Sequence, residues 1–487
     1  MFRVTVKALL AIVALYFLLF FGLTRVGLLG PDEPRYASIG REMAFSGDWV
    51  TPRLWGRPWF EKPALLYWMT GIAFRCGLGD DLAPRVPVAA ASVLFLGFFF
   101  LLLRREFGSR PALYASLMLA TSAGWVSFSQ LCLTDLPMAA AFAASLLLCL
   151  RWLATGERGG LLPAGVLLGV AVLAKGLVPV ALFLPVAWMG RKRWRDCALL
   201  FGFAALTAAP WYVLCTLANG PDFLEEFFWK HHLARFATPG LQHVQPFWFY
   251  LPVLLAALLP WTPAAVVLLR RSLYRDCRLR LLLAVSLFGL VFFSASANKL
   301  PGYLLPLLPP LAAIAGAGLA RARSAGLVLA ACALPLALIP IAADLLPRAL
   351  LTGLSRAGQP PLSWYAAAPA LVLALGVWWL DRAGRRDAAV VCLALAVTTG
   401  LAWLKVTAFP VLDRTVSARG IWRQIAPGTL DVCVGNVHRN IRYGLNYYSI
   451  DPLPPCSRTE RPFHIRQTEG SPAEVVPAFA DVPPGAR

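Results

Sequence analysis

The chain has 487 residues, of which 59% are hydrophobic and only 14% are charged, and its mean hydropathy is +0.65. One soluble core could not bury this much apolar surface, so the composition excludes a single water-soluble domain and indicates a polytopic membrane protein. The formal net charge of +20 does not indicate nucleic-acid binding, because Lys and Arg fall in short clusters between apolar runs.

These apolar runs are roughly 18 to 22 residues long, which is the length that crosses a bilayer as a helix. We predict about thirteen crossings, at residues 8–27, 86–103, 111–129, 136–154, 161–174, 176–190, 198–217, 248–269, 281–297, 303–320, 325–343, 362–380 and 388–404. The first run follows Arg3 and Lys7 but has no small-x-small cleavage site after it, so we expect an uncleaved first helix.

Alternate connections between these runs are rich in Arg and Lys, and the positive-inside rule assigns those connections to the cytoplasm. The remaining segments then face the other side: 28–85, 130–135, 218–247, 298–302, 344–361 and everything after about residue 405. This parity requires the apolar stretch 64–74 to lie in the membrane interface, since it is too short to span.

The chain is therefore predicted to contain two parts. Residues 1–405 form a transmembrane domain whose first periplasmic loop, 28–85, carries interfacial helices, and residues 406–487 form a small soluble α/β domain. Strands are expected at 432–437 and 443–450. Cys433 and Cys456 share this domain in an oxidising compartment, so we expect a disulfide between them; the alternative is two free thiols.

Acidic residues stand at the outer ends of two predicted helices. Asp32 follows the first helix within a segment where charged residues alternate with Trp, and Asp135 lies between two helices with Thr134 as its polar neighbour. Carboxylates can simply mark the end of a span. An ionisable group at such a boundary is nevertheless costly and usually functional, so both are candidate catalytic residues.

Cations and aromatic residues lie in the same outer loops. Glu61 and Lys62 follow Trp59 at the membrane surface, and Lys175 lies on the outer side against the positive-inside trend, which suits a phosphate ligand. The simpler alternatives are a snorkelling Lys and an aromatic belt.

Two further outer loops offer phosphate-binding side chains. His232 and Arg235 form a cationic cluster, and Lys299 and Tyr303 lie at the same face. The first of these loops could equally be a plain amphipathic interfacial helix.

Carboxylates, cations and aromatic walls at one membrane surface indicate transfer of a group carried on a lipid phosphate. The leaving phosphate is a weak base, so Arg35, Lys62 or Arg235 would help more than a general acid. The carboxylates would orient the acceptor, hold a divalent metal, or act as base towards a hydroxyl acceptor.

Several motifs in the first 310 or so residues carry a family resemblance: PDEPRYA at 31–37, SGDWVTPRL at 46–54, FEKP at 60–63, Thr134 with Asp135, LAKG at 173–176, FFWKHHLARF at 227–236 and KLPGYLLP at 299–306. The chain resembles the lipid-phosphate-dependent glycosyltransferases of the GT-C fold, and within them the ArnT-like aminoarabinose transferases and the related protein O-mannosyltransferases. That resemblance implies a thirteen-helix bundle with interfacial helices in the first outer loop and an α/β outer domain at the C-terminus.

The resemblance also implies roles for individual residues. It makes Asp32 the principal catalytic carboxylate and Asp135 the second acidic residue, and Glu61 and Lys62 contacts of a metal or the lipid phosphate. The residues expected to line the donor and acceptor pocket are Arg35, His232, Arg235 and Tyr303.

We therefore expect an inverting glycosyltransferase of the bacterial inner membrane with a periplasmic active site. It would move 4-amino-4-deoxy-L-arabinose or another amino sugar from undecaprenyl phosphate to a phosphate of lipid A. One alternative is transfer to hydroxyls of a protein or glycan. Another class, a lipid or sugar transporter, would need charges near the bilayer midplane and usually paired repeats, neither of which the sequence shows.

Overall fold

The computed structural model describes residues 2–234, 245–358, 364–425 and 431–478. The helices of the apolar body are α1 (Phe2–Leu15), α4 (Val86–Phe107), α5 (Ser109–Ala120), α6 (Ala123–Phe128), α7 (Asp135–Thr155), α8 (Leu161–Lys175), α9 (Val178–Leu182), α10 (Leu184–Met189), α11 (Trp194–Asn219), α12 (Pro221–Leu224), α14 (Tyr250–Ala257), α15 (Cys277–Ala295), α16 (Leu308–Ala320), α17 (Gly326–Ala333), α18 (Ile339–Thr352), α19 (Trp364–Arg382) and α20 (Arg386–Thr415). Short 3-10 or π-helical segments lie between them: η1 (Tyr16–Phe20), η2 (Arg158–Gly160), η3 (Arg191–Arg193), η4 (Glu225–Ala234), η5 (Phe247–Phe249), η6 (Thr262–Leu269), η7 (Arg271–Arg275), η8 (Pro301–Leu307), η9 (Leu334–Leu338) and η10 (Leu354–Arg356).

The predicted apolar runs are largely helical where the structure describes them, and together they form a bundle of helices. Eight helices in the described part of the chain are long and apolar enough to cross a membrane, or nine if the pair bent by 112° around Pro260 is one span. Several other runs are divided into shorter helices at Pro residues, because Pro cannot donate the backbone hydrogen bond that continues a helix.

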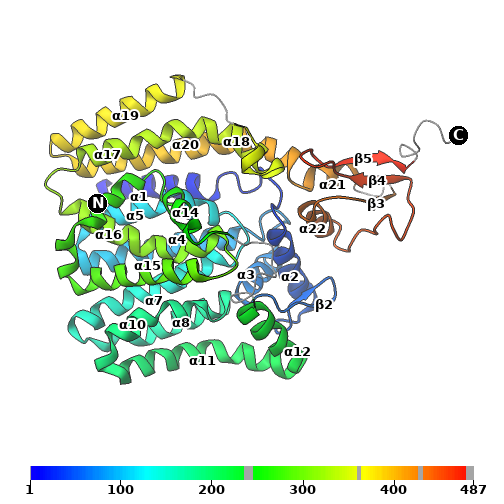
Figure 1. Cartoon of the computed structure of the whole chain (residues 1–487), viewed down its shortest axis with the longest axis horizontal. Coiled ribbons are helices and arrows are strands. Elements are labelled where there is room, and N and C mark those ends of the chain that lie inside the picture. The colour runs from blue at the N-terminus through cyan, green and yellow to red at the C-terminus, as the bar shows by residue number, and fades with distance from the viewer. Residues whose placement is uncertain (1, 235–244, 359–363, 426–430, 479–487) are drawn as a thin grey trace.

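The long helices lie side by side, and α7 and α16 are the most deeply buried of them. α7 packs against α4 and α8, and α16 packs against α5 and α15. In Figure 1 the polar elements gather at the right-hand end of this bundle. This arrangement leaves one end of an apolar body covered by the segments that carry charge.

The first polar segment forms a compact unit at that end. α2 (Asp32–Ser46) packs against α3 (Leu65–Arg75), and β1 (Arg53–Leu54) pairs with β2 (Arg57–Pro58) in a short antiparallel hairpin. α3 has 11 residues, too few to cross a bilayer. The prediction that 64–74 does not span is therefore consistent with the structure.

The C-terminal lobe contains α21 (Arg419–Ile425), β3 (Val432–Val434), α22 (Arg439–Tyr448), β4 (Phe463–Arg466) and β5 (Glu474–Pro477). β4 pairs in parallel with β3 and antiparallel with β5, so the lobe is α/β. α20 continues to Thr415, so the membrane helix extends beyond the predicted boundary at residue 405.

One strand prediction in this lobe was wrong: residues 443–448 belong to helix α22. His438 caps the helix by accepting a hydrogen bond from the Asn440 backbone, and Ile441 and Leu445 lie four residues apart on its buried face. Residues 443–450 taken alone suggested a strand, because the helical spacing of the apolar residues appears only when Ile441 is included.

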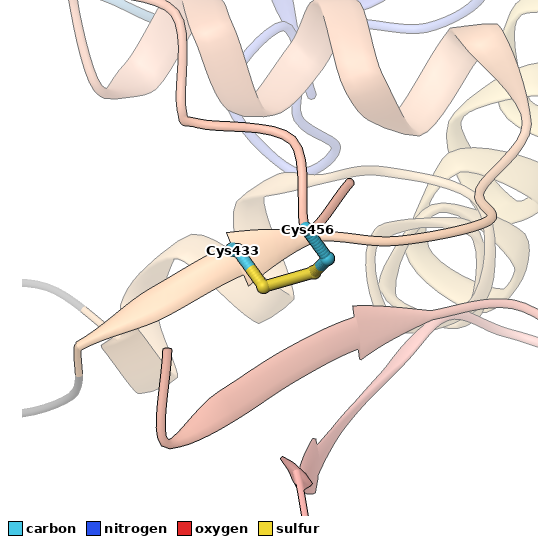
Figure 2. Close-up of a disulfide and its surroundings, with 2 residues drawn as sticks. All are labelled: Cys433 and Cys456. Atoms are coloured by element: carbon cyan, nitrogen blue, oxygen red, sulfur yellow. A yellow bond between two sulfur atoms is a disulfide. The ribbon is translucent and has the colours of Figure 1, made fainter. Parts of the chain in front are cut away.

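Figure 2 shows Cys433 of β3 joined to Cys456 by a disulfide, which closes a loop with a sequence separation of 23. Because this cross-link limits the unfolded chain, we expect replacing both with Ser to lower the unfolding free energy of the lobe by about 3 kcal/mol. Proteolysis of the lobe during a temperature ramp would report the change. Cys76→Ser, at an exposed free thiol, is the control. Alkylation of both Cys433 and Cys456 without reductant would contradict the pairing.

Candidate functional site

A cavity opens where the polar end meets the bundle, with a volume of about 1290 Å³ including its open part. Its charged and hydroxyl-bearing lining includes Asp32, Glu61, Lys62, Asp135, Lys175 and Tyr303. Much of the remaining wall is apolar and comes from residues such as Phe128, Leu133, Met138, Phe292 and Phe293. Segments far apart in the chain therefore supply one cavity that is lined by both charged and apolar side chains.

Asp32 is the first residue of α2, where the helix dipole favours a carboxylate. Arg35, one turn later, pairs with Asp32 and also donates from Nη1 to Glu61 Oε2 at 3.1 Å and from Nε to the Pro31 carbonyl at 3.0 Å. Burial opposes the charged form of Arg35, but Glu61 and Asp32 outweigh it and raise its pKa above the ordinary value. Arg35 thus stays charged and holds two cavity carboxylates together.

Glu61 lies between two cations. Its Oε1 accepts from Lys62 Nζ at 3.0 Å while its Oε2 accepts from Arg35. Tyr36 and Tyr67 are buried near it, and burial, reinforced by the negative charge of Glu61, raises the pKa of both phenols. Both tyrosines are therefore neutral, and Lys62 carries the positive charge that faces the cavity.

The second carboxylate has a similar setting on other helices. Asp135 is the first residue of α7 and pairs with Lys175, the last residue of α8, so each charge lies at the helix end whose dipole favours it. Lys175 Nζ also lies 4.7 Å from the ring centroid of Tyr303. The packing of α7 on α8 brings this pair together.

Gly302 leaves room for Asp135. A Cβ at residue 302 would lie 2.6 Å from Asp135 Oδ1 and 2.7 Å from Phe128 Cε1, both too close for real contacts. The backbone of η8 therefore approaches the carboxylate more closely than any residue with a side chain allows.

Sequence reasoning missed Arg85 and gave no role to Glu33, although these two form the best-connected buried ion pair near the site. Their side chains are about 1% exposed and join at 2.7 and 2.8 Å. Arg85 also donates to carbonyls of the segment before α2, and Glu33 accepts from the backbone of Cys132 at 3.0 Å. The pair ties the residue next to Asp32 to the loop that leads into Asp135. No local sequence signal could show this, because the two residues are 52 positions apart.

Some predicted residues do not line the cavity. Trp59 contacts Arg35, with the guanidinium carbon 5.4 Å from its ring centroid, so it reaches the site only through Arg35. Lys299 is buried and donates to the carbonyls of Ser296 and Gln245 at 2.7 and 3.0 Å. Its ammonium therefore joins its own loop to residue 245. The side chain of His232 and the whole of Arg235 lie outside the described residues.

Comparison with known proteins identifies relatives. A family model described as dolichyl-phosphate-mannose-protein mannosyltransferase matches residues 61–223. The undecaprenyl phosphate-alpha-4-amino-4-deoxy-L-arabinose arabinosyl transferase of Pseudomonas aeruginosa (strain UCBPP-PA14) is 36% identical over 317 residues, which is 61% of this chain and 57% of that protein. The chain thus matches little more than half the length of that relative.

Solved structures extend the likeness over most of the chain. ArnT from Cupriavidus metallidurans, in a crystal structure with undecaprenyl phosphate, has 28% identity and a TM-score of 0.73, covering 92% of this chain and 85% of that one. This chain resembles ArnT over most of its length and shares its GT-C fold. The oligosaccharyltransferase AglB from Archaeoglobus fulgidus, at 12% identity and a TM-score of 0.50, shares the fold alone. The predicted GT-C fold is confirmed, and so is the predicted resemblance to ArnT-like proteins.

The cavity does not offer a divalent metal a suitable set of ligands among its described residues. Both oxygens of Glu61 already accept from cations, which would repel a metal ion. Within the described ranges, three close metal-ligating side chains occur together only at Cys433, Cys456 and His464, where both sulfurs belong to the disulfide. The expectation of Glu61 as a metal ligand therefore gains no support, since its two oxygens accept hydrogen bonds from Arg35 and Lys62.

Proposed function

We propose that this chain transfers a sugar from undecaprenyl phosphate, with inversion at the anomeric carbon, to an acceptor at the periplasmic face of a bacterial inner membrane. One observation carries the proposal: Asp32 and Asp135 share a single cavity, each paired with a cation, and Lys62 and Lys175 face the same space. The ArnT-like fold and the names of the relatives point to the same donor.

The charges of the cavity suit this reaction. The bond from the anomeric carbon to the phosphate oxygen breaks while the acceptor oxygen bonds from the opposite face. Negative charge then grows on the leaving phosphate, where Lys62 and Lys175 would stabilise it. Positive charge develops on the sugar, as in other glycosyl transfers, where Asp32 and Asp135 would offset it.

The apolar wall suits the isoprenoid part of the donor. Phe128, Phe292 and Phe293 line the same cavity as the charged residues. A lipid tail lying against these rings would keep the phosphate at the membrane surface, next to the lysines. A free sugar nucleotide would leave this wall exposed to water, which is unfavourable.

The names of the relatives support the choice of sugar, and the acceptor is our own proposal. Their names specify 4-amino-4-deoxy-L-arabinose, and we propose this amino sugar as the group transferred. We propose lipid A phosphate as acceptor. An ionised phosphate needs no deprotonation, so Asp32 would position the reactants and balance charge.

A second candidate is transfer to a hydroxyl of a protein or glycan, which the description of the matching family model favours. Asp32 would then act as general base, for which its partly exposed side chain, 39% accessible, is suited.

Purified full-length protein in liposomes, supplied with undecaprenyl phosphate carrying labelled aminoarabinose, decides between these acceptors. Labelled lipid A, identified by mass spectrometry, supports the first proposal, and labelled peptide or glycan supports the second. Movement of the intact donor across the vesicle membrane with no transfer to any acceptor would instead identify a transporter and overturn both.

Removal of divalent metals should leave the transfer rate unchanged, because the described carboxylates of the cavity are neutralised by Arg35, Lys62 and Lys175. Initial rates with and without EDTA measure this. Loss of activity with EDTA and its return with Mg²⁺ or Mn²⁺ would show that a metal replaces these ion pairs during turnover.

A further inference from the structure

The C-terminal lobe reaches the site through Tyr443. Helix α22 packs against α2, and the ring centroid of Tyr443 lies 5.3 Å from the guanidinium carbon of Arg35. Trp59 approaches the same carbon at 5.4 Å. Both distances are within the range of cation–π attraction, so two aromatic rings from distant parts of the chain contact one guanidinium.

A third aromatic residue supports Tyr443. The ring of Trp55, at the turn of the β1–β2 hairpin, stacks on Tyr443 with centroids 5.9 Å apart and planes 25° apart. Trp55 has φ of 53°, a left-handed conformation that is unfavourable for a residue with a bulky side chain. Such a conformation persists only where its surroundings maintain it, which fits the contact between the hairpin and the lobe.

Hydrogen bonds set the position of α22 on the polar end. Tyr447 Oη donates to the Asp80 carbonyl at 2.6 Å, and Tyr448 Oη donates to Asp81 Oδ1 at 3.1 Å. Arg41 donates to the Tyr447 carbonyl at 2.5 Å. The Asp80 carbonyl and the side chains of Asp81 and Arg41 are therefore joined to the end of α22, and this sets the position of Tyr443, one turn earlier.

We propose that Tyr443 is a positioning residue for the transfer reaction. It acts through Arg35, whose donors reach the Pro31 carbonyl, Asp32 and Glu61. With Trp59 it limits the movement of the guanidinium and keeps water from it, and so keeps Asp32 and Glu61 in their places. The effect on turnover rests on the proposed function, whereas the shielding of Arg35 does not.

The chemistry of the contact predicts which substitutions are tolerated. Among the described residues, no hydrogen bond involves the Tyr443 hydroxyl, and the contacts with Arg35 and Trp55 are made by the ring. Phe should therefore replace Tyr443, whereas Ala should not. Arg442, the exposed neighbour of Tyr443 on α22, provides the control.

The experiment compares Tyr443→Ala, Tyr443→Phe and Arg442→Ala in the full-length protein with labelled lipid-linked sugar as donor. We expect Tyr443→Ala to lower kcat about tenfold, the scale of one desolvated cation–π contact, with little change in the KM for the donor. Tyr443→Phe and Arg442→Ala should resemble the wild type. A wild-type kcat in Tyr443→Ala would overturn the inference and leave the proposed function intact.

A second measurement does not depend on activity. Phenylglyoxal modifies accessible Arg side chains, and peptide mapping quantifies the modification of Arg35. Arg35 should react faster in Tyr443→Ala than in the wild type, and Tyr443→Phe should restore protection. Equal reactivity in all variants would refute the inference, as would faster proteolysis of the lobe in both Tyr443 variants, which would show that Tyr443 only anchors α22.

Discussion

Replacing Asp32 with Asn should lower the rate of sugar transfer by about 10²- to 10³-fold, the usual cost of removing one preorganised charge from an active site. The substitution keeps the size of the side chain but removes the charge that faces the cavity. Folding should be preserved, because Asp32 is partly exposed and Arg35 retains its bonds to Glu61 and the Pro31 carbonyl.

Single-turnover rates and thermal unfolding of the detergent-solubilised protein measure the two effects separately. Asp222→Asn, at an exposed carboxylate in α12, is a matched control for the loss of one negative charge on the same side. A near-normal rate for Asp32→Asn would remove Asp32 from its assigned role. A variant that does not fold would show instead that its pair with Arg35 stabilises the protein.

The Gly302→Ala substitution should reduce transfer by about 10²-fold, because displacing a reacting group by as little as 1 Å can cost that much. The added methyl group would lie 2.6 Å from Asp135 Oδ1 and 2.7 Å from Phe128, so the carboxylate or the ring must move. Movement of Asp135 would disturb its pair with Lys175. The loss should appear mainly in kcat, since Lys62, which would bind the donor phosphate, keeps its hydrogen bond to Glu61.

Gly202→Ala is the control for this prediction, because a Cβ at residue 202 of α11 meets no atom within 4 Å. Both variants should insert in the membrane and unfold at temperatures similar to the wild type. Full activity of Gly302→Ala would show that the reaction does not depend on the position of Asp135.

Most charged side chains of the cavity could be chosen from the sequence, but their partners could not. Asp32, Asp135 and Lys175 were chosen because each is an ionisable residue at the outer end of an apolar run, and Lys62 because it lies in a polar loop at the membrane surface. The pairing of Asp135 with Lys175 could not be predicted, because the two residues meet only through the packing of α8 on α7. Lys299 has the same sequence context, yet the loop around it turns its ammonium towards backbone carbonyls.

The C-terminal lobe shows the same division. Cys433 and Cys456 were paired from the compartment and from their shared polar segment, whereas helix α22 was taken for a strand and Tyr443 was given no role. Short amphipathic segments of a small domain carry weak local signals, and packing on α2 decides their form.

By itself, the sequence determined that the chain is a multi-pass membrane protein, which loops share one face, and which charges those loops carry. These properties depend on the apolar runs and the positive clusters, since the transfer of each segment into the bilayer depends mainly on its own composition. Only the tertiary structure decided that Arg35 holds Asp32 and Glu61, that Glu33 and Arg85 join two loops, and that Tyr443 shields Arg35. Those contacts link residues up to some 400 positions apart, and their geometry follows from how whole helices pack.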